Sequence, residues 1–97
     1  MSIDARRRRI DEIDDELLRL LNRRLESVIQ IGHAKAESGT TISDPDRESA
    51  IMDRLLIRND GPLDADAIRR IFETIIAEMR RLEFDYAQSG DPGNESR

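Results

Sequence analysis

The chain has 97 residues, a net charge of −5 and no cysteine. This length suits one domain, and the lack of cysteine excludes disulfides, zinc–thiolate sites and thiol nucleophiles. The negative charge argues against nucleic acid as the main partner. No apolar run is long enough to span a membrane, and no signal-peptide core is present, so we expect a cytoplasmic protein without a membrane partner.

The segment from Ala5 to Ser38 predicts one long helix, because it contains no proline and its first clear stop is Ser38-Gly39. Its apolar residues recur at helical spacing: Ile10, Ile13, Leu17, Leu20, Leu21, Val28 and Ile31. Such a helix is about 50 Å long, whereas a compact chain of this size has a radius of gyration of about 12–13 Å. We therefore expect a second copy of the chain to cover the apolar stripe in an intertwined homodimer.

Two cations, Arg24 and Lys35, share the angular position of this stripe, and Arg7 lies at its edge. A buried cation is costly unless an anion meets it, so the stripe is consistent with a binding site for an anion. The alternative is that these long side chains reach solvent at the border of an interface or meet carboxylates of the second copy. Periodicity alone leaves both interpretations open.

The second helix is expected to start at Asp44-Pro45, an acidic cap followed by proline, and to run to about Arg58. Its buried face is centred on Ile51 and Leu55. Arg47 and Glu48 lie one turn before Ile51 and flank that face on either side. Adjacent residues do not face each other on a helix, so we expect both to border the interior separately.

Asp64 can cap a third helix, which should run to about Tyr86. Its apolar face consists of Ile68, Ile71, Phe72, Ile75, Ile76, Met79, Leu82 and Tyr86. Glu83 lies within this face and must be paired with a cation or protonated by burial, while Arg69, Arg70, Arg80 and Arg81 point mostly outward. Residues 1–87 are expected to form the helical domain, and the polar tail 88–97 to be disordered.

Other chemistry lacks its usual signals. The single histidine, His33, is expected on the solvated side of the first helix, and we predict no metal site. The inward cations and carboxyls instead suit binding of a small polyanion, with any catalysis resting on positioning and electrostatics. The non-enzymatic alternative is a helical dimerisation module whose inward charges set the register of the two chains.

Over about residues 5–86 the sequence resembles the all-helical class of chorismate mutases. Four pieces carry the resemblance in register, and they are Arg7-x-x-Ile10-Asp11-x-Ile13-Asp14-x-x-Leu17-Leu18-x-Leu20-Leu21-x-x-Arg24, Ile31-Gly32-x-x-Lys35, Asp44-Pro45-x-Arg47-Glu48, and Ile71-Phe72-x-x-Ile75-Ile76 followed by Glu83. The resemblance implies an all-α, intertwined six-helix homodimer of three-helix chains with two shared active sites. It also implies cofactor-free conversion of chorismate to prephenate by a [3,3] rearrangement, as in phenylalanine and tyrosine biosynthesis.

The resemblance also implies roles for individual residues. Arg24 would bind one substrate carboxylate, and Arg7 of the other subunit would bind the second. Lys35 and Glu83 would stand beside the ether oxygen of the breaking bond, with Arg47 adding positive field. Glu48 would accept from the ring hydroxyl, helped by the backbone at Asp44.

One departure from the family pattern concerns Met79, which stands where bacterial members often have a small hydroxyl residue near a substrate carboxylate. A thioether cannot donate a hydrogen bond to that carboxylate. Relatives on the same scaffold act on 4-amino-4-deoxychorismate or remove pyruvate from isochorismate, so these reactions are the alternatives. The sequence also leaves open whether a larger shikimate-pathway enzyme binds and activates the chain.

Overall fold

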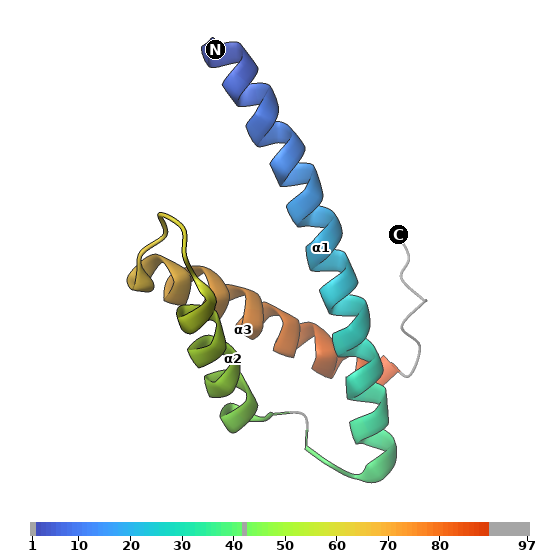
Figure 1. Ribbon diagram of the computed structural model, residues 1–97. Helices are drawn as coiled ribbons and strands as arrows, with labels where there is room; N and C mark the ends of the chain where they lie inside the picture. The colour runs from blue at the N-terminus through green and yellow to red at the C-terminus, as the bar shows by residue number, and fades with distance from the viewer. Residues whose placement is uncertain (1, 42, 90–97) are drawn as a thin grey trace.

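The computed structural model describes residues 2–41 and 43–89, and all of its regular secondary structure within these residues is helical. Three helices follow one another along the chain, α1 (Ile3–Ser38), α2 (Pro45–Arg58) and α3 (Ala65–Ser89) (Figure 1). No strand occurs within the residues described. The predicted all-α class and the predicted number of helices are therefore confirmed.

Local signals set both ends of α1. The Ser2 side chain accepts a hydrogen bond from the Ala5 N–H at 3.1 Å, so the helix begins at Ile3, two residues earlier than predicted. At the other end Gly39 adopts φ 77°, a left-handed conformation that glycine adopts without strain. Its N–H is directed to the carbonyl groups of Ala36 and Lys35. The predicted stop at Ser38-Gly39 is confirmed.

The N-terminal half of α1 projects from the rest of the molecule, and no other helix covers it in Figure 1. The molecule measures 54 × 34 × 15 Å, and its radius of gyration of 16.4 Å exceeds the value of about 12–13 Å for a compact chain of this length. Five residues of the predicted stripe are 45–55% exposed in the single chain, namely Ile10, Ile13, Leu17, Leu20 and Ile31. Folding of one chain alone therefore leaves this stripe largely uncovered.

A second face of α1, which the sequence analysis did not identify, packs against α3. It contains the buried residues Ile29 and Gly32. Ile29 lies about 120° around the helix from Leu17, so it is not part of the predicted stripe. His33 is a related correction, since it is half-buried and its Nε2 atom is buried without a hydrogen-bond partner among the described residues. The reason is its position about 40° from Ile29, next to the face that α3 covers.

Helices α2 and α3 begin with aspartate caps, as predicted. Asp44 accepts from the Arg47 N–H at 3.1 Å, and Asp64 accepts from the Ala67 N–H at 2.8 Å. Both α1 and α2 pack on α3, which is therefore the central element. The buried apolar core consists of Ile29 of α1, Ile51 of α2, and Ile68, Ile76 and Met79 of α3.

The end of α3 differs from the expectation. The helix continues through Gln88 to Ser89, although we expected it to end near Tyr86 and the disordered tail to begin at residue 88. The sequence has no helix breaker before Gly90, and the Ser89 hydroxyl donates to the Tyr86 carbonyl at 3.0 Å. The remainder of the predicted tail, 90–97, lies outside the described residues. No helix in the described part of the chain is long and apolar enough to cross a membrane.

Candidate active site

A cavity of about 140 Å³ lies where side chains of all three helices meet. Seven of the eight predicted site residues line it, and they are Arg24, Lys35, Asp44, Arg47, Glu48, Met79 and Glu83. Its apolar wall is formed by Val28 and Ile31 of α1, Ile51 of α2 and Ile76 of α3. Positions up to 59 residues apart in the sequence are thus brought together around one small space.

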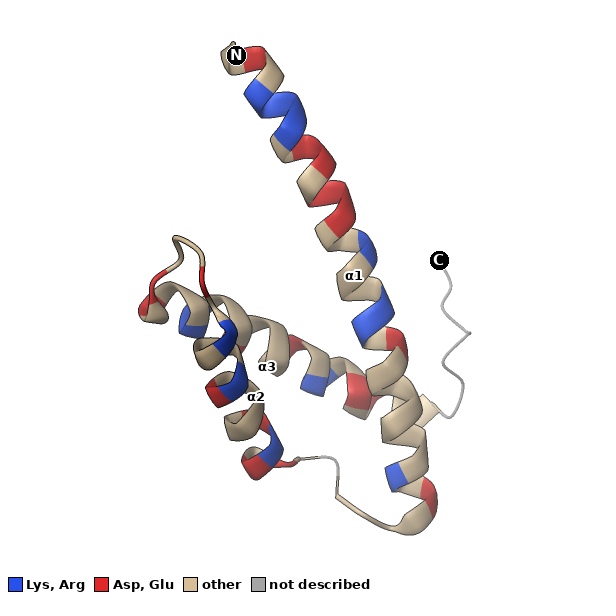
Figure 2. Cartoon of the chain, viewed as in Figure 1, with Lys and Arg blue, Asp and Glu red and all other residues tan. Residues whose placement is uncertain are grey.

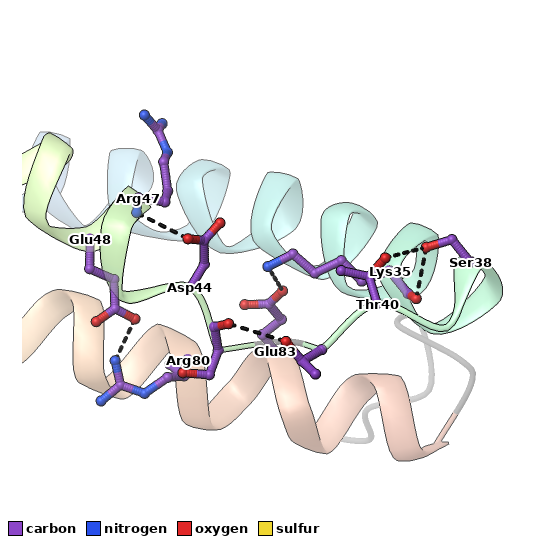
Figure 3. A network of polar contacts seen from close by, with 10 residues as sticks. Lys35, Ser38, Thr40, Asp44, Arg47, Glu48, Arg80 and Glu83 are labelled. Carbon is purple, nitrogen blue, oxygen red and sulfur yellow. Dashed lines mark hydrogen bonds and ion pairs between the residues drawn. The ribbon is translucent and has the colours of Figure 1, made fainter.

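Lys35 and Glu83 face each other across the junction of α1 and α3 (Figure 3). The Lys35 Nζ atom lies 3.3 Å from Glu83 Oε2, and the two side chains are only 21% and 9% exposed. Glu83 is the one charged residue that is buried within the described part of the chain. Its Oε2 atom has no hydrogen-bond partner there, so charge attraction rather than a directed hydrogen bond joins the pair. The predicted inward orientation of both residues is confirmed.

Arg24 enters the cavity from α1 and contacts Met79 of α3. Its Nη1 atom donates to the Met79 Sδ atom at 2.9 Å. Burial lowers the pKa of the Arg24 guanidinium from its ordinary value, and the positive charge of nearby Arg47 lowers it further. Arginine nevertheless keeps its proton. Two cations therefore lie close together in a partly desolvated site, an arrangement that an anionic ligand would stabilise.

The first turn of α2 contributes three neighbouring polar residues. The Asp44 carboxylate accepts a hydrogen bond from the Arg47 N–H. The Asp44 carbonyl accepts one from the Glu48 N–H at 3.1 Å. The Arg47 side chain is exposed and, in Figure 3, points away from Glu48. Glu48 is half-buried. The prediction that the two side chains lie apart is confirmed, and both residues line the cavity, but Arg47 is exposed where the helix phase had placed it at the edge of the buried face.

Arg80 is a cavity residue that the sequence analysis missed, since it was expected to point outward. Its Nη1 atom donates to Glu48 Oε2 at 2.5 Å, which joins α3 to α2 (Figure 3). Its position on the helix could have indicated this inward direction, because Arg80 follows the apolar residue Ile76 by four residues and lies about 40° from it. Four cations and three carboxyls consequently line the cavity.

Arg7, the eighth predicted residue, does not line the cavity of its own chain. It lies on the projecting half of α1, where a run of four arginines is followed by a group of carboxylates (Figure 2). Arg7 precedes Arg24 by 17 positions, which is about 25 Å along a helix. Arg7 can therefore reach such a cavity only in another copy of the chain.

Comparison with known proteins identifies the family. The profile of chorismate mutase type II matches residues 6–84, which include all of α2 and most of α1 and α3. The chain belongs to this family. The chorismate mutase of Methanocaldococcus jannaschii is 30% identical over 84% of each chain. The structure of chorismate mutase (Form II) from Thermus thermophilus superimposes with a TM-score of 0.83 at 35% identity, covering 84% of this chain and 93% of that one.

Several relatives are longer proteins. The bifunctional chorismate mutase/prephenate dehydratase of Neisseria gonorrhoeae is 36% identical over 79% of this chain. Only 21% of that protein takes part in the match, so the chain spans about a fifth of the length of such bifunctional relatives. The match covers 84% of the Methanocaldococcus protein and 93% of the Thermus chain.

The cations that line the cavity of this type II family member are suited to binding carboxylates. The site offers guanidinium groups from α1, α2 and α3 and the Lys35 ammonium group within one cavity. Guanidinium groups bind carboxylates strongly in fixed geometry, and the ammonium group adds a concentrated positive charge. The one buried carboxyl of the site, Glu83, adjoins Lys35. The arrangement can hold a small dianion and stabilise charge that develops near Lys35.

Proposed function

We propose that this chain catalyses the [3,3] rearrangement of chorismate to prephenate without a cofactor. Family membership supports the reaction, and the observation that carries it to this chain is the convergence of Arg24, Lys35 and Arg47 with buried Glu83 in one cavity. Chorismate is a dianion whose enolpyruvyl arm must fold over the ring. Cations that fix both carboxylates would hold that folded conformation and so lower the entropic part of the barrier.

In the transition state negative charge builds on the ether oxygen of the breaking bond. We infer that Lys35 and Glu83 flank this oxygen, because they share the most buried polar part of the cavity. Donors already directed at that point stabilise the transition state more than the ground state, which raises turnover. Glu83 can donate only in its protonated form. Arg47 adds positive field, and Arg24 binds one carboxylate.

We further propose an intertwined homodimer in which Arg7 of the second copy binds the other carboxylate. Two observations support it. The exposed stripe that includes Ile10, Leu17 and Ile31 is too apolar to remain in water. Arg7 lies about 25 Å from Arg24 along the same helix, so it cannot serve the cavity of its own chain. A two-fold dimer would cover the stripe and complete both sites at once.

Glu48 bears on the choice among related substrates. In the proposed complex its carboxylate, backed by the Asp44 backbone, accepts from the ring hydroxyl. Arg80 already offsets the negative charge of Glu48 at 2.5 Å. An ammonium group on the ring would need an uncompensated carboxylate, whereas a hydroxyl needs only an acceptor. The Glu48–Arg80 pair therefore favours chorismate over 4-amino-4-deoxychorismate.

The direct experiment is to supply chorismate to the purified chain and to follow the loss of its ultraviolet absorbance. Prephenate is identified by chromatography, because it has the same mass as chorismate. Parallel assays with 4-amino-4-deoxychorismate and isochorismate, the latter monitored for pyruvate release, separate the three reactions by kcat/KM. Lys35→Ala protein purified in the same way measures the contribution of host enzymes. Turnover of chorismate no faster than in that control would contradict the proposal.

A further inference from the structure

Gly32 of α1 lies directly against Glu83 of α3. Gly32 is buried. A Cβ atom built on it would lie 2.7 Å from Glu83 Cγ, a separation that real Cβ atoms essentially never show. The same atom would lie 3.4 Å from the Glu83 carbonyl oxygen and 3.5 Å from Oε2. The Glu83 side chain thus occupies the space that any other residue at position 32 would fill.

Backbone conformation does not account for this glycine. Gly39 is the glycine with positive φ in the described part of the chain, so Gly32 has the ordinary helical conformation that alanine also adopts. Glycine inside a helix is less favourable than alanine by about 1 kcal/mol. The helix would therefore be more stable with alanine at this position, and the close contact with Glu83 is the feature that opposes alanine.

The contact bears directly on the candidate site. Glu83 Cγ carries the carboxyl that lies 3.3 Å from Lys35 Nζ, and Lys35 follows Gly32 by three residues on the same helix. A Cβ atom at position 32 would force the Glu83 side chain to rotate, because the Glu83 backbone is held in α3. Rotation about the Cα–Cβ bond of Glu83 would move Cγ out of the way and would carry the carboxyl to a new position relative to Lys35.

We propose that Gly32 is a positioning residue, which by lacking a side chain holds the Glu83 carboxyl in the cavity beside Lys35. The role of Gly32 in catalysis rests on the proposed function, whereas the packing of Gly32 against Glu83 does not. Gly32 touches no substrate in this account. It acts through Glu83, by setting where that carboxyl stands relative to Lys35.

A stability cycle on the full chain tests the packing without any substrate. Gly32→Ala is made in three backgrounds, namely wild type, Glu83→Gln and Glu83→Ala, and each protein is unfolded with urea at one protein concentration. Glutamine keeps Cγ and alanine removes it. We expect Gly32→Ala to destabilise the first two proteins. In the Glu83→Ala background it should raise the ratio of folded to unfolded protein about fivefold, the gain from helix propensity alone.

Each outcome of this cycle is decisive. Gly32→Ala protein that fails to fold in the first two backgrounds but folds with Glu83→Ala supports the proposal. The same effect in all three backgrounds, including failure to fold in all three, would show that Cγ of residue 83 is not what opposes alanine. A gain in stability on wild type would likewise overturn the proposal.

Turnover of chorismate tests the positioning role. A displacement of about 1 Å in a reacting arrangement costs about 100-fold, so Gly32→Ala should lower kcat by about that factor with a smaller change in KM. In the Glu83→Ala background it should cause no further loss, because the displaced group is already absent. Normal kcat in folded Gly32→Ala protein would refute the role. A wild-type chain inactive on chorismate would refute the proposed function, while the stability cycle would still report on the packing.

Discussion

The Arg80 guanidinium of α3 donates to the Glu48 carboxylate of α2 at 2.5 Å, at one wall of the candidate site. Both helices contribute other residues to the cavity, so this ion pair links the position of Glu48 to the central helix. It also leaves the wall at Glu48 with little net charge. The pair therefore fixes the position of Glu48 and also affects which substrate the site prefers.

Removing this cation should change the substrate preference. Arg80→Ala is expected to raise kcat/KM for 4-amino-4-deoxychorismate relative to chorismate by up to about fivefold, because an uncompensated Glu48 attracts an ammonium group in a partly exposed site. Arg80→Lys keeps the charge and should keep the preference. Arg81→Ala is the matched control, since Arg81 pairs with Glu78 and Asp85 on the outer face of α3. If Arg80→Ala leaves the ratio of the two kcat/KM values unchanged, Arg80 does not determine substrate preference.

Lys35 is expected to act in the transition state. Lys35→Ala should lower kcat by about 10²–10³-fold while the fold persists, as judged by circular dichroism. The matched control is Arg19→Ala, which removes an exposed cation of the same helix that pairs with Glu16. Near-normal kcat with a raised KM would assign Lys35 to ground-state binding instead.

The shared site predicts complementation between two inactive proteins. Arg7→Ala and Arg24→Ala homodimers should each be nearly inactive, because each lacks one carboxylate ligand in both sites. After subunit exchange at equal concentrations, half of the dimers are mixed, and each mixed dimer contains one intact site. Activity should then recover to about a quarter of the wild-type value. Exchange shown by differently tagged chains without recovery of activity would exclude a site shared in this way.

The uncovered stripe of α1 predicts an obligate dimer. Light scattering at micromolar concentration should give about twice the chain mass of 11.2 kDa. Leu17→Lys places a charge in the stripe and should abolish the folded dimer. Ile57→Lys is the control, since Ile57 of α2 is 83% exposed and lies outside the stripe. A folded, active monomer, or an unaltered Leu17→Lys dimer, is incompatible with this architecture.

The position of Glu83 predicts different results for two substitutions. Glutamine keeps a side chain that can donate a hydrogen bond to the ether oxygen, whereas alanine removes it. Glu83→Gln should therefore keep substantial turnover of chorismate, and Glu83→Ala should lower kcat by about 10²–10³-fold. The measurement is kcat for both purified proteins. Equal kcat values in the two variants would contradict a place for Glu83 beside the ether oxygen.

Local signals in the sequence determined the helices. Proline, glycine and the capping aspartates act over a few residues, so the stop at Gly39 and the starts at Asp44 and Asp64 were predictable from their neighbours alone. Helix phase similarly indicated that Arg24, Lys35 and Glu83 point inward, because the angle between two residues on one helix depends only on their spacing.

Tertiary structure decided which helix faces meet. Phase gives the angle of a residue on its own helix but not which neighbour covers that angle, so the α3-facing surface at Ile29 and the half-buried His33 were missed. The ion pair of Arg80 with Glu48 and the contact of Gly32 with Glu83 join residues 32 and 51 positions apart. Such contacts depend on the crossing of α1 and α2 over α3, which no local spacing in the sequence specifies.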